Sequence, residues 1–276
     1  MAIPVSADQA GIFAANRARG RIGLGVVAAG GITRRERVLE KGSLRVRFPG
    51  PVGPRLEAML VNTAGGIAGG DRFALDITVN DGAQLAVTST AAEKVYRSLG
   101  PDATIDLTLA VGTNGSLAWL PQETILFDGA RLRRCVEVDL AESASLVLAE
   151  AVVFGRAAMG ETVEHGSLFD RWRVRRGGRL VFAETVRLGD DIGASLRQCA
   201  VGAGAAALAT LFVCPADAEK IASARACSGL RSDVAVSAWS GFAVARFLAG
   251  DGAALRYDLA VVLAALGVTP PRLWLS

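Results

Sequence analysis

The feature that most constrains this chain is a glycine-rich stretch from Val61 to Asp71, in which four glycines fall within six residues and an aspartate follows directly. Glycine loses more backbone entropy on ordering than any other residue, so this stretch is neither a helix nor the interior of a regular strand. Glycine is favoured where φ is positive or where another part of the chain comes very close. The prediction is a structural turn built on Gly65, Gly66, Gly69 and Gly70.

A phosphate-binding loop is a second interpretation of this stretch. Such a loop needs Gly-Lys-Ser/Thr, followed by a helix whose amides hold the phosphates. Here Asp71 stands at the lysine position, and a strand-like segment from residue 73 to 79 follows. Because a carboxylate repels phosphate, the sequence favours a turn between two strands over a phosphate site.

Composition excludes several classes of protein. The chain has 276 residues, of which 51% are apolar, so it can bury a large core and is not disordered. A net charge of +3, from 30 basic and 27 acidic residues, is too balanced to indicate nucleic acid or an anionic membrane as partner. The uncharged run from Gln198 to Ala216 has an apolar part too short to span a membrane and is expected to be buried core. No signal peptide is visible, so we expect a soluble cytoplasmic protein with a single domain over residues 1–276.

Nitrogen and sulfur ligands for a metal are scarce. The chain has one histidine, His165, and no C-x-x-C pair. Its four dispersed cysteines are expected to act as small buried apolar residues; they are Cys135, Cys199, Cys214 and Cys227. No zinc site of standard spacing can be built, so neither a tight metal site nor a cofactor is expected.

Alternation of apolar and polar residues predicts strand after strand from residue 72 to 189. Leu75, Ile77 and Val79 show it clearly, and residues 176–179, Arg-Gly-Gly-Arg, have the composition of a hairpin turn. A G-x-G-x-x-A match in residues 21–28 is accidental, because two glycines interrupt any following helix.

An internal echo runs through this β region. Leu85, Leu117, Leu146 and Leu180 occupy the same place in four similar segments and are spaced by 32, 29 and 34 residues. A recurrence of this size predicts stacked β units that cover one another's apolar faces. Because the match is short, a β-sandwich stays open as an alternative.

Helices are expected only near the C-terminus. Residues 215–228 begin with Pro and carry acidic residues in the first turn, and residues 251–266 place four apolar side chains on one face. Between them, residues 234–248 are expected to form a strand. The predicted fold class is therefore mainly β, with β-helix-like or solenoid-like stacked strands and two helices near the C-terminus.

Three polar clusters could carry chemistry. Glu123 and Asp128 flank an apolar Ile-Leu-Phe and could act as the acid and base of a glycosidase, although their spacing alone favours a solvated loop with turn carboxylates. Glu93 lies in a polar segment that a buried ionic network would explain. Glu161 and His165 could share a metal only on a helix, and flanking glycines argue against one. No G-x-S-x-G elbow is present, which disfavours a conventional hydrolase.

Taken in order, these segments resemble the urease accessory protein UreD family, called UreH in some organisms. The resemblance covers most of the chain from about residue 30 to the end, and its segments are residues 62–71 (NTAGGIAGGD), 90–98 (TAAEKVYRS), 120–128 (LPQETILFD), 155–161 (GRAAMGE), 170–174 (DRWRV) and 271–274 (PRLW). The resemblance implies a scaffold without enzymatic activity, with a β-helix-type fold and two late helices. It also implies binding to the accessory proteins F and G, the latter a GTPase, and docking on apo-urease.

The resemblance further implies that Ni²⁺ passes transiently through the interior toward the urease active site. Dispersed carboxylates bind such an ion weakly enough to release it. The candidates are Asp71, Glu93, Glu123, Asp128 and Glu161. Asp128 and Glu161 are preferred, because each closes a motif. A carbohydrate-active β-solenoid enzyme using Glu123 and Asp128 is the alternative from another class.

Overall fold

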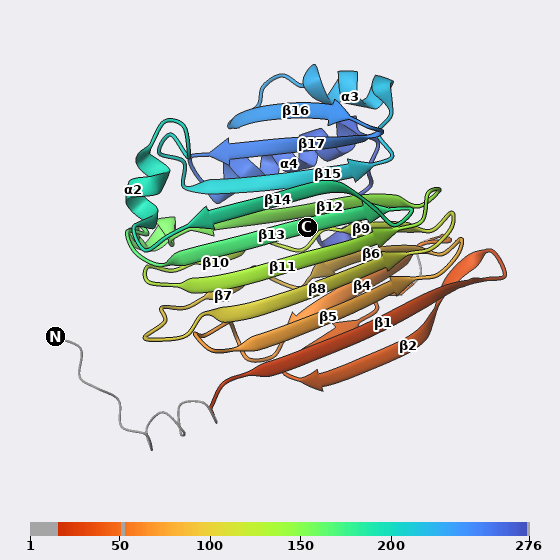
Figure 1. Cartoon of the computed structure of the whole chain (residues 1–276), viewed down its shortest axis with the longest axis horizontal. Helices are drawn as coiled ribbons and strands as arrows, with labels where there is room; N and C mark the ends of the chain where they lie inside the picture. Colours follow the sequence, from red (N-terminus) through yellow and green to blue (C-terminus); the bar gives the residue numbers. More distant parts are fainter. Residues whose placement is uncertain (1–15, 51–52, 275–276) are drawn as a thin grey trace.

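The computed structural model describes residues 16–50 and 53–274, which form two facing β-sheets with helices at one side (Figure 1). In spatial order, the first sheet contains β14 (Arg179–Leu188), β13 (Ser167–Arg176), β11 (Arg131–Leu140), β8 (Ala103–Val111), β5 (Arg72–Val79), β1 (Arg19–Ala29) and β2 (Ile32–Gly42). The second contains β16 (Asp233–Trp239), β17 (Phe242–Ala249), β15 (Ala207–Cys214), β12 (Ser145–Phe154), β9 (Ser116–Trp119), β6 (Gln84–Ser89), β4 (Leu56–Asn62) and β3 (Leu44–Arg47), extended by β10 (Thr124–Leu126) and β7 (Glu93–Val95).

Between β4 and β13 the chain winds as a solenoid. The chain passes back and forth between the two sheets, with the short strands β7 and β10 added to the second sheet, and strands of successive coils pair in parallel. Parallel neighbours need a long connection, and here the connection is a strand of the opposite sheet. The mainly β, solenoid-like prediction is confirmed.

The leucine echo is the visible trace of these coils. Leu85 pairs with Leu117, and Leu117 pairs with Leu146, so these three side chains stack in one ladder of the second sheet. The fourth member of the echo was predicted wrongly. Leu180 lies on β14, which is antiparallel to β13 in the first sheet, and its side chain is 54% exposed. A leucine two residues after a hairpin glycine mimics the start of a coil.

Antiparallel strands close both ends of the solenoid. At one end β2 pairs with β1, and at the other β14 pairs with β13 while β15, β17 and β16 extend the second sheet. The predicted hairpin turn joins β13 to β14, where Gly177 and Gly178 have φ of 55° and 77°. Positive φ at both central residues matches the right-handed twist of the flanking strands.

Two apolar layers hold the structure together. The larger lies between the sheets, and the smaller lies between the outer face of the second sheet and α4. That outer face is rich in alanine, for example Ala86, Ala118 and Ala149, so the leucines of α4 come close to the sheet. The helices are α2 (Ile192–Arg197), α3 (Ala218–Arg225) and α4 (Gly252–Ala265), with short 3-10 turns η1 (Ala157–Met159) and η2 (Arg272–Trp274).

Both predicted C-terminal helices are present, and the aspartate before each accepts a hydrogen bond from an amide of its first turn. Three expectations need correction. Residues 234–248 are a hairpin of two strands, β16 and β17, because Ser240 and Gly241 adopt positive φ and reverse the chain. Within residues 198–216 only β15 is buried core, since residues 198–201 are exposed. Helix α2 was not predicted.

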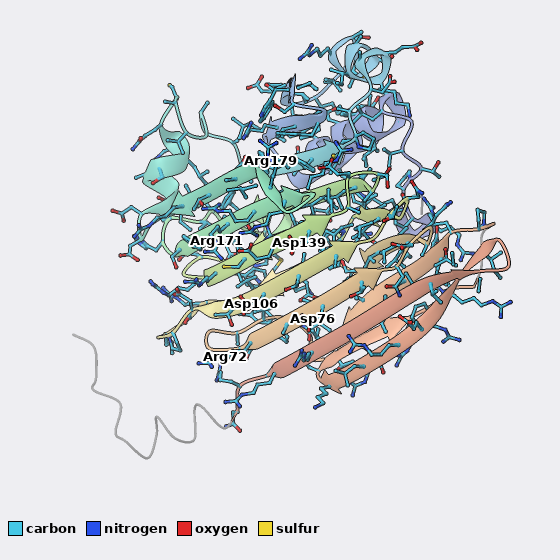
Figure 2. All side chains as sticks on the ribbon, turned by 45° about the vertical axis from the view of Figure 1, so that its right-hand side comes forward. Arg72, Asp76, Asp106, Asp139, Arg171 and Arg179 are labelled. Carbon is cyan, nitrogen blue, oxygen red and sulfur yellow. The ribbon has the colours of Figure 1, made fainter. Side chains whose placement is uncertain are left out.

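The outer face of the first sheet is polar. Figure 2 shows charged side chains along β5, β8, β11 and β13 on this face, among them Asp106 and Asp139, which are exposed. The residues of 21–28 lie in β1 and have no helix after them, so the dinucleotide-loop match is indeed accidental. Among the described residues, no helix is long and apolar enough to cross a membrane. The expectation about a signal peptide concerns residues outside the described part.

Candidate functional site

The four longest of the unusual sequence segments meet at one end of the solenoid, where the chain leaves β4, β7, β10 and β12. We call residues 62–71, 90–98, 120–128 and 155–161 the motif cluster. Its members are joined by hydrogen bonds: Tyr96 Oη donates to the Gly65 carbonyl at 2.9 Å, the Glu93 amide to the Glu123 carbonyl at 2.9 Å, and the Gly155 amide to the Leu126 carbonyl at 2.8 Å. Segments distant in the sequence thus form one connected surface.

The glycine-rich loop has the geometry of a tight turn. Gly66 and Gly70 have φ of 148° and 88°, values that L side chains rarely adopt. A Cβ on Gly66 would lie 2.5 Å from Cε2 of Tyr96, and one on Gly69 would lie 2.0 Å from Oγ of Ser98. Gly65 also has a positive φ but faces open space. The glycines therefore let the segment containing Tyr96 and Ser98 lie against this loop.

Asp71, the carboxylate that follows these glycines, is buried and occupied by backbone amides. Its Oδ1 accepts from the Ala18 amide at 2.8 Å, and its Oδ2 accepts from the Ala68 amide at 2.7 Å. The two oxygens therefore tie the end of the glycine-rich loop to the residue before β1 and to Ala68 of the loop itself.

Asp128 and Glu161 lie together at the surface of the motif cluster. Oδ1 of Asp128 accepts from the amides of Glu164 and His165 at 3.0 and 2.9 Å. The His165 amide is the main cause that holds the pKa of Asp128 below its ordinary value. The Glu161 carboxylate accepts from Arg156 Nε and Nη2 at 2.8 and 3.1 Å, and the Arg156 hydrogen bond is the main cause of its lowered pKa. Both groups are ionised at neutral pH.

Glu123 lies beside helix α4. Its Oε1 accepts from Arg256 Nη1 of α4 at 2.8 Å, and the same nitrogen contacts Oε1 of Gln122. Glu123 and Asp128 therefore do not act as a pair, because Glu123 binds a side chain of α4 whereas Asp128 binds the backbone amides of residues 164 and 165.

Of the five candidate carboxylates, Glu93 alone lines the interior. A cavity of about 90 Å³ lies between the sheets, and its polar wall includes Asn62, Glu93, Gln122, Thr124, Arg134 and Glu150. Asn62 Nδ2 donates to Glu93 Oε2 at 3.0 Å. Burial raises the pKa of Glu93 above its ordinary value, and the Asn62 hydrogen bond only partly offsets this.

A buried ionic triad stands at the far wall of this cavity. Arg134 of β11 contacts Asp170 of β13 in its own sheet and Glu150 of β12 in the opposite sheet. Trp119 Nε1 donates to Glu150 Oε1 at 2.8 Å, and Trp172 Nε1 donates to Asp170 Oδ1 at 3.0 Å. Two carboxyl groups face one guanidinium, so the triad holds one acidic group more than it has basic groups.

Burial and charge act on the triad in opposite directions. Burial disfavours the charged form of Arg134, but the carboxylates of Asp170 and Glu150 outweigh it and raise the pKa of the guanidinium. Burial raises the pKa of Glu150, and Arg134 only partly counters it. Beyond the triad a smaller cavity of about 10 Å³ is lined by Asp170, Glu184 and Thr210 among others.

The sequence places the chain in a known family. The model of the UreD urease accessory protein family matches residues 18–275. The chain belongs to the UreD family. It is 54% identical over 275 residues to the urease accessory protein UreD of Rhodopseudomonas palustris strain BisA53, covering 99% of this chain and 96% of the relative. It is 55% identical over 266 residues to the UreD protein of Bradyrhizobium diazoefficiens strain USDA 110, covering 96% of each.

Membership of the UreD family confirms the resemblance drawn from the motifs and makes this chain an accessory factor in urease maturation, not an enzyme. The alternative of a carbohydrate-active enzyme therefore loses its support. The two carboxylates it requires are tied to Arg256 and to the amides of residues 164 and 165.

Sequence reasoning missed Arg134 and Glu150 of this UreD chain and noted Asp170 only as part of a motif. A signal was present in each of the three strands. Arg134, Glu150 and Asp170 each occupy an inward position in a row of alternating apolar residues, as Arg134 does between Leu132 and Val136. A charged residue in the buried register of a strand is costly unless paired, so three of them indicate a shared interior network.

The nitrogen and sulfur ligands of this UreD chain remain dispersed. The expectation of buried cysteines holds for Cys135 and Cys214 but is wrong for Cys199, which is exposed, and for Cys227, which is half-buried. Nδ1 of His165 lies 3.5 Å from Oδ1 of Asp191 at the surface. Within residues 16–50 and 53–274 no group of three or more His, Cys, Asp or Glu side chains is arranged to hold a metal ion.

Proposed function

We propose that this protein is a urease maturation scaffold that binds the accessory proteins F and G and apo-urease and lets Ni²⁺ pass through its interior to the urease active site. The observation that carries the proposal is a small set of carboxylates among the apolar side chains between the two sheets. Glu93, Glu150 and Asp170 lie on the walls of two cavities between the stacked coils. A solenoid core needs no buried carboxylates for stability, since replacing buried ion pairs by apolar residues is often neutral.

The chemistry of this interior suits transient contact with a divalent cation. Its carboxylate, amide and hydroxyl oxygens are weaker ligands for Ni²⁺ than thiolate or imidazole. Weak and repeated sites allow an ion both to enter and to leave. Glu93 is our first candidate for a contact inside the scaffold, and within the motif cluster it accepts a hydrogen bond from Asn62.

The other four candidates take places at the ends of this route in our proposal. Asp128 and Glu161 would present negative charge at the surface of the motif cluster, where a partner exchanges the ion. Asp71 and Glu123 would act by shaping the glycine-rich loop and the contact with α4. Arg256 and the backbone amides already engage these carboxylates, so their contact with nickel would be brief.

The deciding experiment compares two glutamates of the second sheet. Glu93→Gln removes a charge from the interior, whereas Glu57→Gln removes one that faces away from it. Glu57 is 3% exposed and pairs with Arg55 and Arg272. Each variant is co-expressed with F, G and urease, and both the recovered complex and the nickel content of urease are measured.

The proposal predicts that Glu93→Gln preserves the complex and lowers the nickel per urease, while Glu57→Gln preserves both. Full nickel loading with Glu93→Gln would overturn the proposed interior route, of which Glu93 is the first contact. Loss of the complex in proportion to the loss of nickel would instead assign Glu93 to the fold or to a partner surface.

A further inference from the structure

The two interior cavities are separated by a single wall. Arg134 and Glu150 line both the cavity of about 90 Å³ and that of about 10 Å³, and Asp170 lines the smaller one. Arg134 is 3% exposed and reaches across from the first sheet to Glu150 on the second. Its guanidinium therefore fills the space between the sheets at the point where one cavity ends and the next begins.

All four carboxylate oxygens at this wall are occupied. Arg134 Nε donates to Asp170 Oδ1 at 3.1 Å, and its two terminal nitrogens contact Oδ2 of Asp170 and Oε2 of Glu150. The remaining oxygen, Oε1 of Glu150, accepts from Trp119. Trp119 and Trp172 hold the carboxylates in place, so the guanidinium is the part of the wall that can leave without unfolding a strand.

We propose that Arg134 is a cationic gate between the two cavities, an inference that rests on the proposed passage of nickel through the interior. In the closed state the guanidinium is the counter-ion of Glu150 and Asp170 and repels an arriving cation. Arginine does not lose its proton, so deprotonation cannot open the gate. A divalent cation passes only by taking the place of the guanidinium between the two carboxylates, after which Arg134 returns and releases the ion.

The alternative is a purely structural role, in which the triad only fixes the register of three strands. The two views differ in what removing the cation does. A buried guanidinium that is a mere structural tie leaves a destabilised core when it is lost. A gate leaves a pair of carboxylates that are already positioned for a cation.

The test uses Ni²⁺ alone and the isolated, full-length protein. Because Trp119 and Trp172 donate to the two carboxylates, Ni²⁺ bound there quenches their fluorescence. Arg134→Gln is compared with the wild type and with the double variant Arg134→Gln/Asp170→Asn, which restores the wild-type excess of one acidic group but keeps a single carboxyl group. We expect Arg134→Gln to bind Ni²⁺ about tenfold more tightly than either, by a saturable quench.

Arg134→Lys is a second variant that keeps the test possible if Arg134→Gln does not fold. A lysine keeps the charge but is a point donor that cannot engage both carboxylates as the guanidinium fork does. We expect its nickel affinity to lie between those of the wild type and Arg134→Gln. Wild-type affinity in every folded variant of Arg134, or equal gains in Arg134→Gln and the double variant, would overturn the gate.

Nickel transfer to urease separates this inference from the proposed function. A gate that has become a trap retains nickel, so Arg134→Gln is expected to lower the nickel content of urease while the complex still assembles. A gain in affinity with full nickel transfer would overturn the gate. The proposed function fails on a different result, namely unchanged nickel transfer with Glu93→Gln.

Discussion

Trp119 donates its indole N–H to the buried carboxylate of Glu150 at 2.8 Å, from β9 to β12 within the second sheet. These two strands pair in parallel, so the bond ties one coil of the solenoid to the next. It is also the only hydrogen bond found for Oε1 of Glu150 in the described residues, since Arg134 uses the other oxygen.

Trp119→Phe is therefore expected to lower the free energy of unfolding by about 1–3 kcal/mol, because a buried carboxylate oxygen loses its donor. Urea-induced unfolding followed by circular dichroism measures this. Trp239→Phe is the matched control, because Trp239 is 44% exposed and makes its contacts through ring packing with Phe242. Equal losses in the two variants would show that ring volume, and not the hydrogen bond, sets the effect.

Glu93 should make the stability of the protein depend on pH in a direction opposite to that of most carboxylates. Burial raises its pKa in the folded state, so the folded protein binds the proton more tightly than the unfolded chain does. The wild type therefore gains stability from this group as the pH falls from neutral through its folded pKa toward the ordinary value for glutamate. Above the folded pKa the ionised group is a net cost.

Glu93→Gln removes this dependence. We expect the variant to be at least as stable as the wild type at neutral pH, with an advantage that shrinks as the pH is lowered to about 5, near the ordinary glutamate pKa. Urea titrations at several pH values give the difference directly. An advantage of the variant that grows on acidification would mean that Glu93 is stabilised as the anion in the fold.

Substitutions in the glycine-rich loop should affect stability very differently from one glycine to the next. Gly66→Val and Gly70→Val should be folding defects, each strained by roughly 1–3 kcal/mol, because both residues have positive φ. At Gly66 the new Cβ would also displace the ring of Tyr96, whose hydroxyl binds the Gly65 carbonyl. The measurements are soluble yield and melting temperature.

Gly65→Asn is the control for this prediction. Gly65 has a φ of 77°, a Cβ added there would have no atom within 4 Å, and asparagine tolerates this conformation. Its melting temperature should stay close to that of the wild type. Wild-type melting of Gly66→Val together with lost urease activation would instead make the loop a functional element.

The repeating coils of this fold were easier to predict from the sequence than the antiparallel strands at its two ends. The ladder of Leu85, Leu117 and Leu146 was predictable because each coil repeats the same turn and strand. Leu180 was misassigned because a hairpin and a coil both begin with glycine followed by a leucine. The triad could not be assembled, since the partners of Arg134 lie 16 and 36 residues away and which strands become neighbours depends on the winding of the coils.

In the motif cluster, too, one part was predictable from the sequence and another was not. Its segments could be singled out by composition, but the roles of their carboxylates depend on contacts between coils. Asp71 serves amides on two different segments, and Glu123 meets a helix more than 100 residues later in the chain. Only the fold separates Glu93, which lines a cavity, from the carboxylates that shape the surrounding loops.

The last prediction concerns Asp128 and Glu161, whose carboxylates hold two turns and are also our candidates for the surface end of a nickel route. Asp128→Asn and Glu161→Gln keep the shape of each side chain and remove its charge. The lowered pKa of Asp128 in the fold means that its contribution to stability is present at neutral pH and is lost as the pH falls through the folded pKa. Some loss of stability at neutral pH is thus expected for Asp128→Asn.

That loss makes a paired measurement necessary. Recovery of the complex with F and G and nickel per urease are determined on the same preparations, with excess nickel as a rescue condition. If the charges contact the ion, the complex persists, nickel per urease falls, and excess nickel partly restores it. If they only hold the turns of a partner surface, nickel falls in proportion to the complex and excess nickel restores nothing. Intact complexes with full nickel loading in both variants would leave the interior residues, Glu93 foremost, as the only carboxylates of the proposed route.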